Sequence, residues 1–396
     1  MKGSATTPGP VPKEALAFFR AKKLKPGFDY RDVWREEHAT NFTVAKAMNL
    51  DVLNSIRDEV DRALADGITF REFGRSLKPR LEKLGWWGVK DRLDPVTGEV
   101  RTVQLGSPRR LRTIYQANLR TARAAGQWDR IERNRQSHPY LLYRLGPSEN
   151  HRAEHVAWDG LLLPIDDPFW AAHMPPNGWG CKCHVRQVSK REYERLKATG
   201  RYLTEAPPTR TREWINKRTG EVTRVPVGID PGWDTNPGRV ARLAQGLETA
   251  TSKINAATPP LAAAGVRTLV QTPGFAAWYK KPEGRFPVGT LPEADAGRIG
   301  AQTHAVLMSS ETAGKQRTIH PDIKASDYAR VQETIERGRR VQDSPRTLIY
   351  FLEEARGFVS VVKATESGKT VFLTSFRRLS RDAAKRDREI KRPLGK

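Results

Sequence analysis

Apolar residues recur at helical spacing in the first part of the chain, and this pattern predicts a helical N-terminal region. One helix face is marked by Leu50, Leu53, Ile56, Val60 and Leu64. Thr69 and Glu72 then form a capping-box pattern that opens the next helix. Pro79 is expected to kink or restart that helix, because proline lacks the N–H that a helix interior uses. Residues 29–48 are also expected to be helical.

The pattern changes after Gly85, where turn residues and alternation replace the helical period. Residues 89–105 predict a β-hairpin, and Ser107 and Pro108 then open a long helix as its N-cap and first-turn residue. Residues 140–144 predict a strand. The tetrapeptide at residues 97–100 returns at residues 219–222, which predicts two similar hairpin turns and not an internal duplication.

Composition shifts divide the chain into four parts. Residues 249–265 are rich in Thr, Ser, Ala and Pro, and we interpret them as a linker. The expected parts are residues 1–106, 107–248, the linker 249–265, and 266–396. The predicted fold class is α+β: a helical N-terminal region with a hairpin, a mixed α/β central domain, and a small C-terminal α+β domain with an antiparallel sheet.

The net charge of +24 on 396 residues is the strongest compositional signal. A chain this basic is attracted to phosphate backbones or to acidic protein surfaces. The alternative is a highly soluble protein without a nucleic-acid role, since the excess charge is spread along the chain. No apolar run approaches the roughly 20 residues of a membrane span, so no membrane partner is expected. Two cysteines in the whole chain fit a reducing compartment, and we expect assembly in a cytoplasm.

Both cysteines lie in one turn-rich stretch, residues 173–185, and predict a metal site. Cys181 and Cys183 are two residues apart, so an extended backbone would present both thiols on one face, where a disulfide would close a strained ring. His151 and His155 would stack on one face of a helix at i, i+4 spacing. Two thiolates and two imidazoles would make a closed, structural Cys2His2 Zn²⁺ site. The alternative is two buried free cysteines with surface histidines.

The same histidines allow a second interpretation. His151-Arg152-Ala153-Glu154-His155 has the H-x-x-E-H spacing of the inverted zinc-protease motif, in which two histidines bind zinc and the glutamate acts as general base. Such a site needs an open coordination position. The nearby thiolates of Cys181 and Cys183 would fill that position, which argues against the protease.

Residues from about 13 to 188 carry a set of uncommon motifs in a characteristic order. These are residues 36–39 with 42–46, the Gly-Trp-Trp-Gly of 85–88, the arginine-rich helix start 109–115, Glu154-His155, residues 166–170, and Pro175-Pro176-Asn177-Gly178-Trp179-Gly180-Cys181-Lys182-Cys183. This part of the chain resembles the phage Mu protein F-like minor head proteins, or phage head morphogenesis proteins.

The resemblance implies a low-copy protein near the portal vertex, needed for head assembly or DNA packaging. Its expected partners are portal and capsid proteins and packaged DNA, and its expected location is the virion, with the host cytoplasm during assembly. His155, Cys181 and Cys183 fall on the family's His and C-x-C positions. His151 lies where other members often carry a different residue, so its ligand role depends on this chain alone.

The C-terminal part of the chain carries a second set of motifs, at residues 306–311, 317–321, 327–328, the strand pair 348–351 and 359–365, and 373–378. With these motifs, residues 266–388 resemble a second family, the phage-borne nuclease-like domains of the barnase, EndoU, colicin and RelE type. The resemblance implies a metal-independent endoribonuclease with RNA as a possible substrate.

Metal-free RNA cleavage needs a base that titrates near neutral pH and cations that stabilise the phosphorane. His320 is the candidate base, Lys363 and Arg377 the candidate cations, and Thr365 and Ser375 the candidate phosphate-binding hydroxyls. The alternative is a binding domain in which His320 caps a helix. A further reading is a toxin-like nuclease effector, delivered by the head-protein part and neutralised by an immunity protein.

Overall fold

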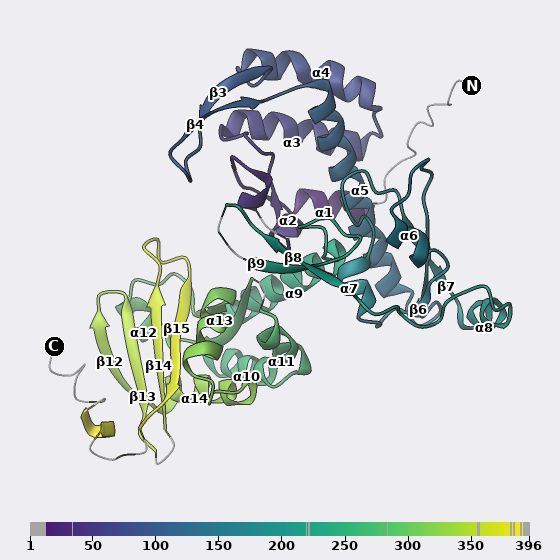
Figure 1. The fold of residues 1–396 in the computed structure, drawn as a ribbon. Coiled ribbons are helices and arrows are strands. Elements are labelled where there is room, and N and C mark those ends of the chain that lie inside the picture. The colour runs from purple at the N-terminus through teal and green to yellow at the C-terminus, as the bar shows by residue number, and fades with distance from the viewer. Residues whose placement is uncertain are drawn as a thin grey trace. The chain divides into compact units, whose positions relative to one another are not determined.

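The computed structural model describes residues 13–390, apart from Trp34, Thr219, Glu221, Glu283, Ala355, Arg356, Arg381, Ala383, Ala384 and Glu389. The ends of the first and last predicted parts, residues 1–12 and 391–396, therefore lie outside the described residues. Contacts divide the chain into two units, Met1–Leu243 and Ala244–Lys396 (Figure 1). Mixed helices and several sheets are consistent with the predicted α+β class.

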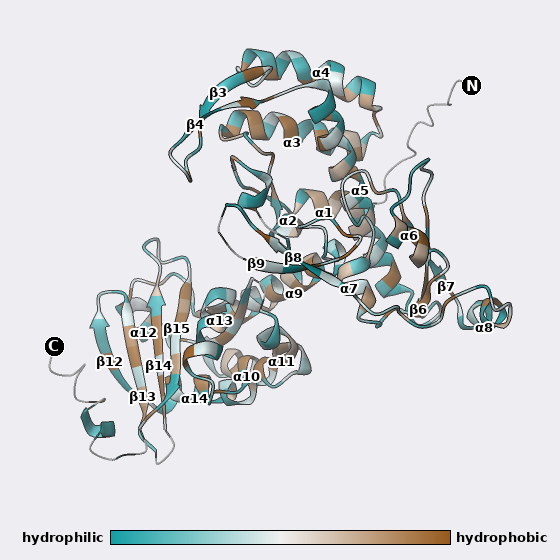
Figure 2. Cartoon of the chain, viewed as in Figure 1, coloured by the Kyte–Doolittle hydropathy of each residue, from teal (hydrophilic) through white to brown (hydrophobic). Residues whose placement is uncertain are grey.

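The first unit is built on helices whose apolar faces share one core. Its helices are α1 (Lys13–Arg20), α2 (Glu37–Thr40), α3 (Leu50–Ala65), α4 (Phe70–Lys83), α5 (Pro108–Arg133), α6 (Ala153–Trp158), α7 (Phe169–His173) and α8 (Lys190–Ala198). Figure 2 shows apolar and polar residues alternating along α3 and α4, as in amphipathic helices. Because α5 packs on α1, α3 and α4, residues 13–106 and the helix that follows them form one core and not two domains.

The predicted helix starts are observed. The Thr69 hydroxyl accepts from the backbone N–H of Glu72, and the Glu72 carboxylate accepts from the N–H of Thr69, so the capping box at α4 is confirmed. Ser107 caps α5 in the same way, with Pro108 in the first turn. The helix α4 runs through Pro79 without restarting there.

Residues 29–48 are not one helix, contrary to the prediction. The described residues of this range form a 3-10 turn at Tyr30–Asp32, the single turn of α2, and the short strand β2 (Asn41–Phe42), which pairs with β1 (Lys23–Leu24). Arg35 and Lys46 adopt positive φ values of 46° and 65°, which a right-handed helix cannot include. The Asp32 carboxylate also accepts the N–H groups of Phe28 and Asp29.

Two hairpins in the first unit confirm the predicted turns. β3 (Val89–Leu93) pairs with β4 (Val100–Gln104), and β8 (Thr211–Ile215) pairs with β9 (Val222–Pro226). Their turns meet, because the guanidinium of Arg218 in the second turn forms a buried ion pair with Asp94 in the first. Thr219 and Glu221 of the repeated tetrapeptide lie outside the described residues.

A small sheet in the first unit, with order β6-β5-β7, carries the cysteine loop. It comprises β5 (Tyr140–Arg144), β6 (Leu162–Pro164) and β7 (His184–Val188). Trp128 of α5, Trp158 of α6 and Trp170 of α7 pack beside this sheet in one core. Cys183 immediately precedes β7, so the sheet holds one end of the cysteine loop.

The second unit is a six-stranded sheet with a helical layer. Its helices are α9 (Pro237–Ala256, which begins in the first unit), α10 (Pro259–Val270), α11 (Pro273–Lys280), α12 (Glu293–Arg298), α13 (Ser310–Ile319) and α14 (Ala329–Arg337), with a 3-10 turn at Ala325–Tyr328. The strands are β10 (Arg285–Thr290), β11 (Ala305–Ser309), β12 (Arg339–Ser344), β13 (Thr347–Leu352), β14 (Phe358–Ala364) and β15 (Val371–Arg378). In Figure 2, the strands β13 to β15 carry many apolar residues.

The sheet of the second unit differs from the prediction. Its order is β10-β11-β15-β14-β13-β12, and the pair β11–β15 is parallel, so the sheet is mixed and not purely antiparallel. The predicted linker, residues 249–265, is mostly helical: α9 continues to Ala256 and α10 begins at Pro259. Leu247 and Ile254 of α9 belong to the core of the second unit, which explains why contacts divide the chain before the predicted linker.

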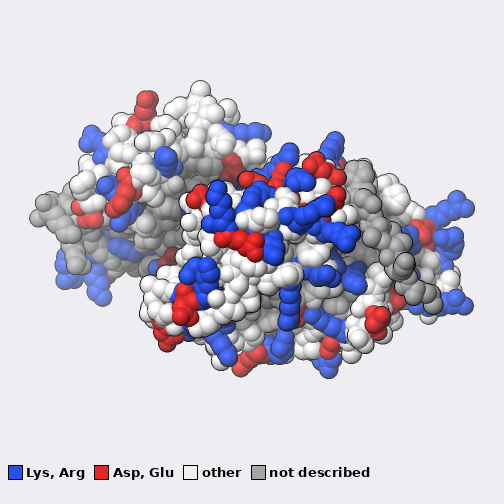
Figure 3. Space-filling view, turned by 90° about the horizontal axis from the view of Figure 1, so that it is seen from above, with Lys and Arg blue, Asp and Glu red and all other residues white. Residues whose placement is uncertain are grey.

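Lysine and arginine side chains are spread over the face seen in Figure 3 and alternate there with aspartates and glutamates. This face therefore presents no continuous cationic stripe. Within the part of the chain that the structure describes, no helix has the length and apolarity of a membrane span.

Candidate metal centre

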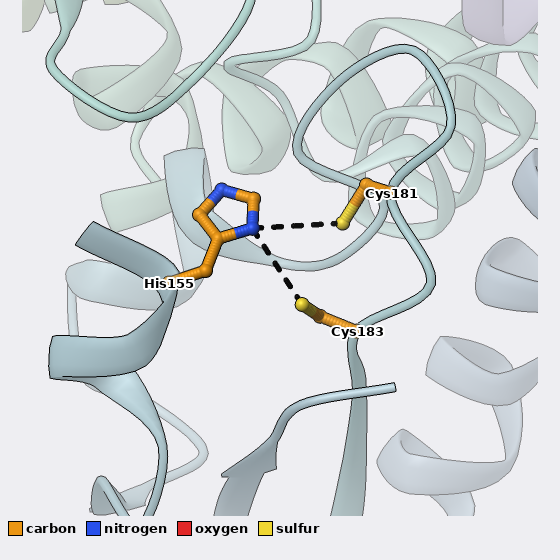
Figure 4. Close-up of side chains that lie close together, drawn as sticks. All are labelled: His155, Cys181 and Cys183. Atoms are coloured by element: carbon orange, nitrogen blue, oxygen red, sulfur yellow. Dashed lines mark hydrogen bonds between the residues drawn. The ribbon is translucent and has the colours of Figure 1, made fainter. Parts of the chain in front are cut away.

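His155, Cys181 and Cys183 converge in the first unit (Figure 4). His155 comes from α6, Cys181 from the loop after α7, and Cys183 from the residue before β7. Nδ1 of His155 lies 3.5 Å from Sγ of Cys183 and 3.9 Å from Sγ of Cys181. All three ligand atoms lie within 4.8 Å of one another, so one ion could contact all of them.

The imidazole of His155 is buried and held from its other nitrogen. Nε2 lies 2.9 Å from the carbonyl oxygen of Gly228, a pure acceptor, so Nε2 carries the proton and Nδ1 presents its lone pair to the sulfurs. The ring also stacks on Trp158 with a centroid distance of 5.0 Å. The imidazole is thus oriented as a metal ligand by its surroundings.

The backbone at residue 228 can reach the His155 ring only because this residue is a glycine. Its φ is +90°, and a Cβ at this position would lie 2.6 Å from Cβ of Glu154. Gly146 is equally constrained, because a Cβ there would overlap the carbonyl of Lys182, between the two cysteines. Neither glycine follows from the cysteine or histidine spacing, and the sequence analysis did not identify them.

The two thiols differ in their electrostatics. A hydrogen bond with Cys181 lowers the pKa of the Cys183 thiol against the effect of burial, and a hydrogen bond with the Gly146 backbone acts in the same direction. The hydrogen bond between the thiols and burial both raise the pKa of Cys181. Cys183 is therefore the thiol that ionises first, and a thiolate is the form that binds metal.

A network of hydrogen bonds supports the cysteine loop. The hydroxyl of Tyr143 donates to Oδ1 of Asn177 at 3.0 Å, and both side chains are buried. Burial raises the pKa of Tyr143 far above its usual range, so the phenol keeps its proton and remains a donor. The guanidinium of Arg120 on α5 donates to the carbonyl of Cys181 at 3.3 Å.

The chemical types of these three donors suit zinc. Two sulfurs and one imidazole nitrogen are the ligands that Zn²⁺ takes in structural sites, and the imidazole already has the backbone acceptor that such sites use. A tetrahedral ion needs a fourth donor. Among the described residues, no other His, Cys, Asp or Glu joins this cluster.

His151 does not join the cluster, contrary to the predicted Cys2His2 set. The i, i+4 argument required a helix across residues 151–155, but α6 begins only at Ala153. His151 therefore precedes the helix and is exposed, and its Nε2 lies 2.8 Å from the carbonyl oxygen of Gly146. The zinc-protease reading through His151, Glu154 and His155 fails for the same reason.

His173 has a structural environment. It is buried, its Nδ1 bonds to the carbonyl of Phe169 at 3.0 Å, and it stacks on the Phe169 ring. Burial lowers its pKa to about 4, so the imidazole is neutral near pH 7.

The five residues proposed for RNA cleavage are not gathered in the second unit. His320 caps the C-terminus of α13, which packs on the core face of the sheet through Ala313. Lys363 alternates with the core residues Val362 and Ala364, so it points to the opposite face.

Ser375, just before the core residue Phe376, also points to that opposite face. Arg377 pairs with Val359, four residues and roughly 13 Å along β14 from Lys363. The Thr365 hydroxyl accepts from the N–H of Thr370 in the β14–β15 turn. The structure thus separates the candidate base from the candidate cations and hydroxyls.

The chain is similar to known proteins, and the family match lies within the first unit. Residues 54–186 match the family model described as "Phage Mu protein F like protein". The protein named "Putative capsid assembly protein F" of Escherichia phage Mu is 40% identical over 241 residues, which cover 58% of this chain and 55% of that protein. The "Mu-like prophage FluMu F protein" of Haemophilus influenzae is 37% identical over 227 residues, 52% of this chain and 53% of that protein.

The chain spans about half the length of these curated relatives. No solved structure matched the chain. The matched segment contains His155, Cys181 and Cys183, and the predicted resemblance is confirmed there, whereas the nuclease resemblance stays a prediction. Residues 54–186 of this chain are therefore similar to the Phage Mu protein F-like family.

Proposed function

We propose that this protein acts in the assembly of phage heads, together with other head proteins. The observation that carries the proposal is the 40% identity, over 58% of the chain, to a relative whose name describes capsid assembly. Contacts with portal and capsid proteins and a place in the virion belong to the same proposal, and so does a role in DNA packaging. A toxin-like effector with an immunity protein is not proposed, because the residues that would cut RNA are separated by the sheet.

We further propose that His155, Cys181 and Cys183 hold a structural Zn²⁺ ion. When bound, zinc supplies a cross-link between α6, the cysteine loop and the start of β7. The protein's own contribution is the orientation of the ligands: Gly228 fixes the imidazole tautomer, and the Gly146 backbone favours the Cys183 thiolate. Thus the role of this centre is to hold an assembly surface in one conformation.

The assembly role is tested by deleting the gene from the phage that carries it and supplying variants from a plasmid. We expect the deletion to abolish intact heads in electron micrographs, and the wild-type gene to restore them. Cys183→Ser should fail to restore them. His184→Ala, which removes an exposed side chain next to Cys183, should restore them fully.

Normal heads from the deleted phage would remove the assembly proposal. Normal heads with Cys183→Ser, but not with the deletion, would retain the assembly role and remove the metal from it.

A further inference from the structure

A cavity of about 310 Å³ lies in the first unit, next to the cysteine loop. Its floor is mostly apolar, with Ala39, Val44 and Ile114 among the lining residues. Pro176 and Trp179 of the cysteine loop form one wall, and Pro231 and Trp233 form another. This volume is at the lower end of the range for ligand pockets and accommodates one or two large side chains.

The walls of this cavity are the segments that hold the metal centre. The carboxylate of Asp230 accepts from the N–H of Trp179 and from the guanidinium of Arg152, both at 2.8 Å. The N–H of Asp230 donates to the carbonyl of Asn177 at 3.0 Å. Asp230 lies two residues after Gly228, which orients His155. Residues 176–183 and 228–237 therefore support the cluster on one side and enclose the cavity on the other.

Three aromatic rings form an apolar edge of the cavity. Trp179 and Trp233 meet edge to face with a centroid distance of 5.0 Å, and Tyr30 meets Trp179 at 6.1 Å. Trp179 is 46% exposed, an unusual exposure for so large an apolar side chain. Exposed tryptophans beside a pocket are typical anchors of protein–protein contacts.

Every fully charged side chain that lines the cavity is cationic. Lys22, Arg35 and Arg110 contribute to the lining, and no aspartate or glutamate does among the described residues. Arg35 pairs with Asp234 at 2.7 Å, and Arg110 donates to the backbone carbonyls of Ala45, Gln104 and Leu105.

The ammonium of Lys22, like the guanidinium of Arg110, has no carboxylate partner among the described residues. Lys22 is only 7% exposed, and its Nζ donates to the carbonyl of His38 at 2.7 Å. Burial lowers the pKa of Lys22 to about 7. Oγ1 of Thr43, also in the lining, is buried and has no hydrogen-bond partner in the described part of the chain. The lining of the cavity thus contains a cation that an incoming anionic group would neutralise.

We propose that this cavity docks a short acidic segment of another head protein, in which an Asp or Glu lies next to a bulky apolar side chain. The carboxylate would meet Lys22, and the apolar side chain would lie in the cavity against Trp179 and Trp233. This inference rests on the proposed assembly function, which supplies the partner protein. A nucleic-acid backbone fits less well, because the lining is mostly apolar and nucleic-acid grooves use rows of exposed cations.

Fluorescence anisotropy with the full-length, zinc-loaded protein tests the proposal. The probes are labelled hexapeptides that pair Glu with Phe, Trp, Leu or Val, and a matched series carries Gln in place of Glu. We expect at least one Glu peptide to bind about tenfold more tightly than its Gln counterpart, since one charge-assisted hydrogen bond is at stake.

Two variants locate the binding. Trp179→Ala removes the exposed edge of the cavity, and Lys22→Met removes the ammonium and keeps the apolar stem. Trp179→Ala should weaken the Glu peptide about tenfold or more, and Lys22→Met should make Glu and Gln peptides equal. Lys90→Met, at an exposed position on β3, is the matched control and should change neither affinity. A cooperative thermal transition and unchanged zinc content show that each variant is folded.

Equal binding of the Glu and Gln series, or no binding of any hexapeptide at millimolar concentration, would overturn the proposal. Binding that survives Trp179→Ala and Lys22→Met in folded protein would do the same. A single-stranded oligonucleotide that binds and is lost in both variants, without peptide binding, would assign the cavity to nucleic acid instead. Because the assay uses purified protein, its failure is distinguishable from a failure of the head-assembly test.

Discussion

The carbonyl oxygen of Gly228 lies 2.9 Å from Nε2 of His155, although the two residues are 73 positions apart in the chain. This contact assigns the imidazole proton to Nε2 and leaves Nδ1 free to face Cys181 and Cys183. A backbone group at positive φ therefore determines the chemistry of a side chain on α6. The first prediction concerns this contact.

Replacing Gly228 by alanine should destabilise the first unit and weaken metal binding. The new Cβ would approach Cβ of Glu154 at 2.6 Å, and the φ of +90° disfavours any side chain. We expect a loss of about 2–4 kcal/mol in the free energy of unfolding, from strain and overpacking together. Zinc affinity should fall about 10- to 100-fold, as for other outer ligand contacts. Urea unfolding and competition with a chromogenic chelator measure the two effects.

Gly98→Ala is the matched control. Gly98 also has a positive φ, +71°, but a Cβ there would meet nothing within 4 Å. We expect a loss of about 1 kcal/mol from backbone strain alone, with zinc affinity unchanged. Equal losses in both variants would show that the contact between Gly228 and His155 has no specific role.

Replacing His155 and His151 one at a time should show which of the two histidines binds zinc. We expect His155→Ala to lose bound zinc, because its Nδ1 is the nitrogen that faces both sulfurs. His151→Ala should retain about one zinc per chain, since that ring bonds to Gly146 outside the cluster. The zinc content of each variant after dialysis, measured by mass spectrometry, tests this prediction. Loss of zinc in both variants would restore the four-ligand site that the sequence predicts.

The buried ammonium of Lys22 should make stability depend on pH. Burial lowers its pKa from 10.5 to about 7, so between these values the unfolded chain binds more protons than the folded one. Stability from this group therefore rises as pH increases from 7 to 10.5, and the cost of burying the charge is greatest below pH 7. Lys22→Met should stabilise the protein most at low pH, and its advantage should shrink toward pH 10.

Urea midpoints at pH 6, 8 and 10 measure this difference between Lys22→Met and wild type. Lys90→Met, at an exposed position, should show no such trend. A difference between Lys22→Met and wild type that stays constant across the three values would mean that Lys22 is solvated in the folded protein.

The ion pair between Arg218 and Asp94 should stabilise both hairpin turns. The side chains of Arg218 and Asp94 are 5% and 0% exposed, and Asp94→Ala would leave the guanidinium with Asp32 alone. We expect a loss of about 2–4 kcal/mol, because the buried guanidinium keeps only one of its two carboxylate partners. Glu99→Ala breaks an exposed pair with Arg101 and should cost under about 1 kcal/mol. Thermal unfolding compares the two, and similar small losses would show that the pair between the turns is solvent-screened.

Local signals in the sequence determined much of the first unit. The capping box at Thr69 and Glu72 and the Ser107-Pro108 start predicted helix beginnings correctly. The turn residues around Asp94 and Gly98 predicted a hairpin. These features depend on residues within a few positions of one another, and so sequence alone is sufficient. The Cys181 and Cys183 pair was likewise recognisable, because two thiols at this spacing share a face.

Contacts between distant residues could only be decided by the tertiary structure. The start of α6 at Ala153 excluded His151 from the cluster, and Gly228 supplied the support for His155. In the second unit, Lys363 lies on the face of β14 that points away from the core, whereas His320 ends a helix on the core side. Packing over the whole unit decides where a helix ends, which residue 73 positions away adopts a positive φ, and which face of a strand is buried. The periodicity of neighbouring residues contains no information about this packing.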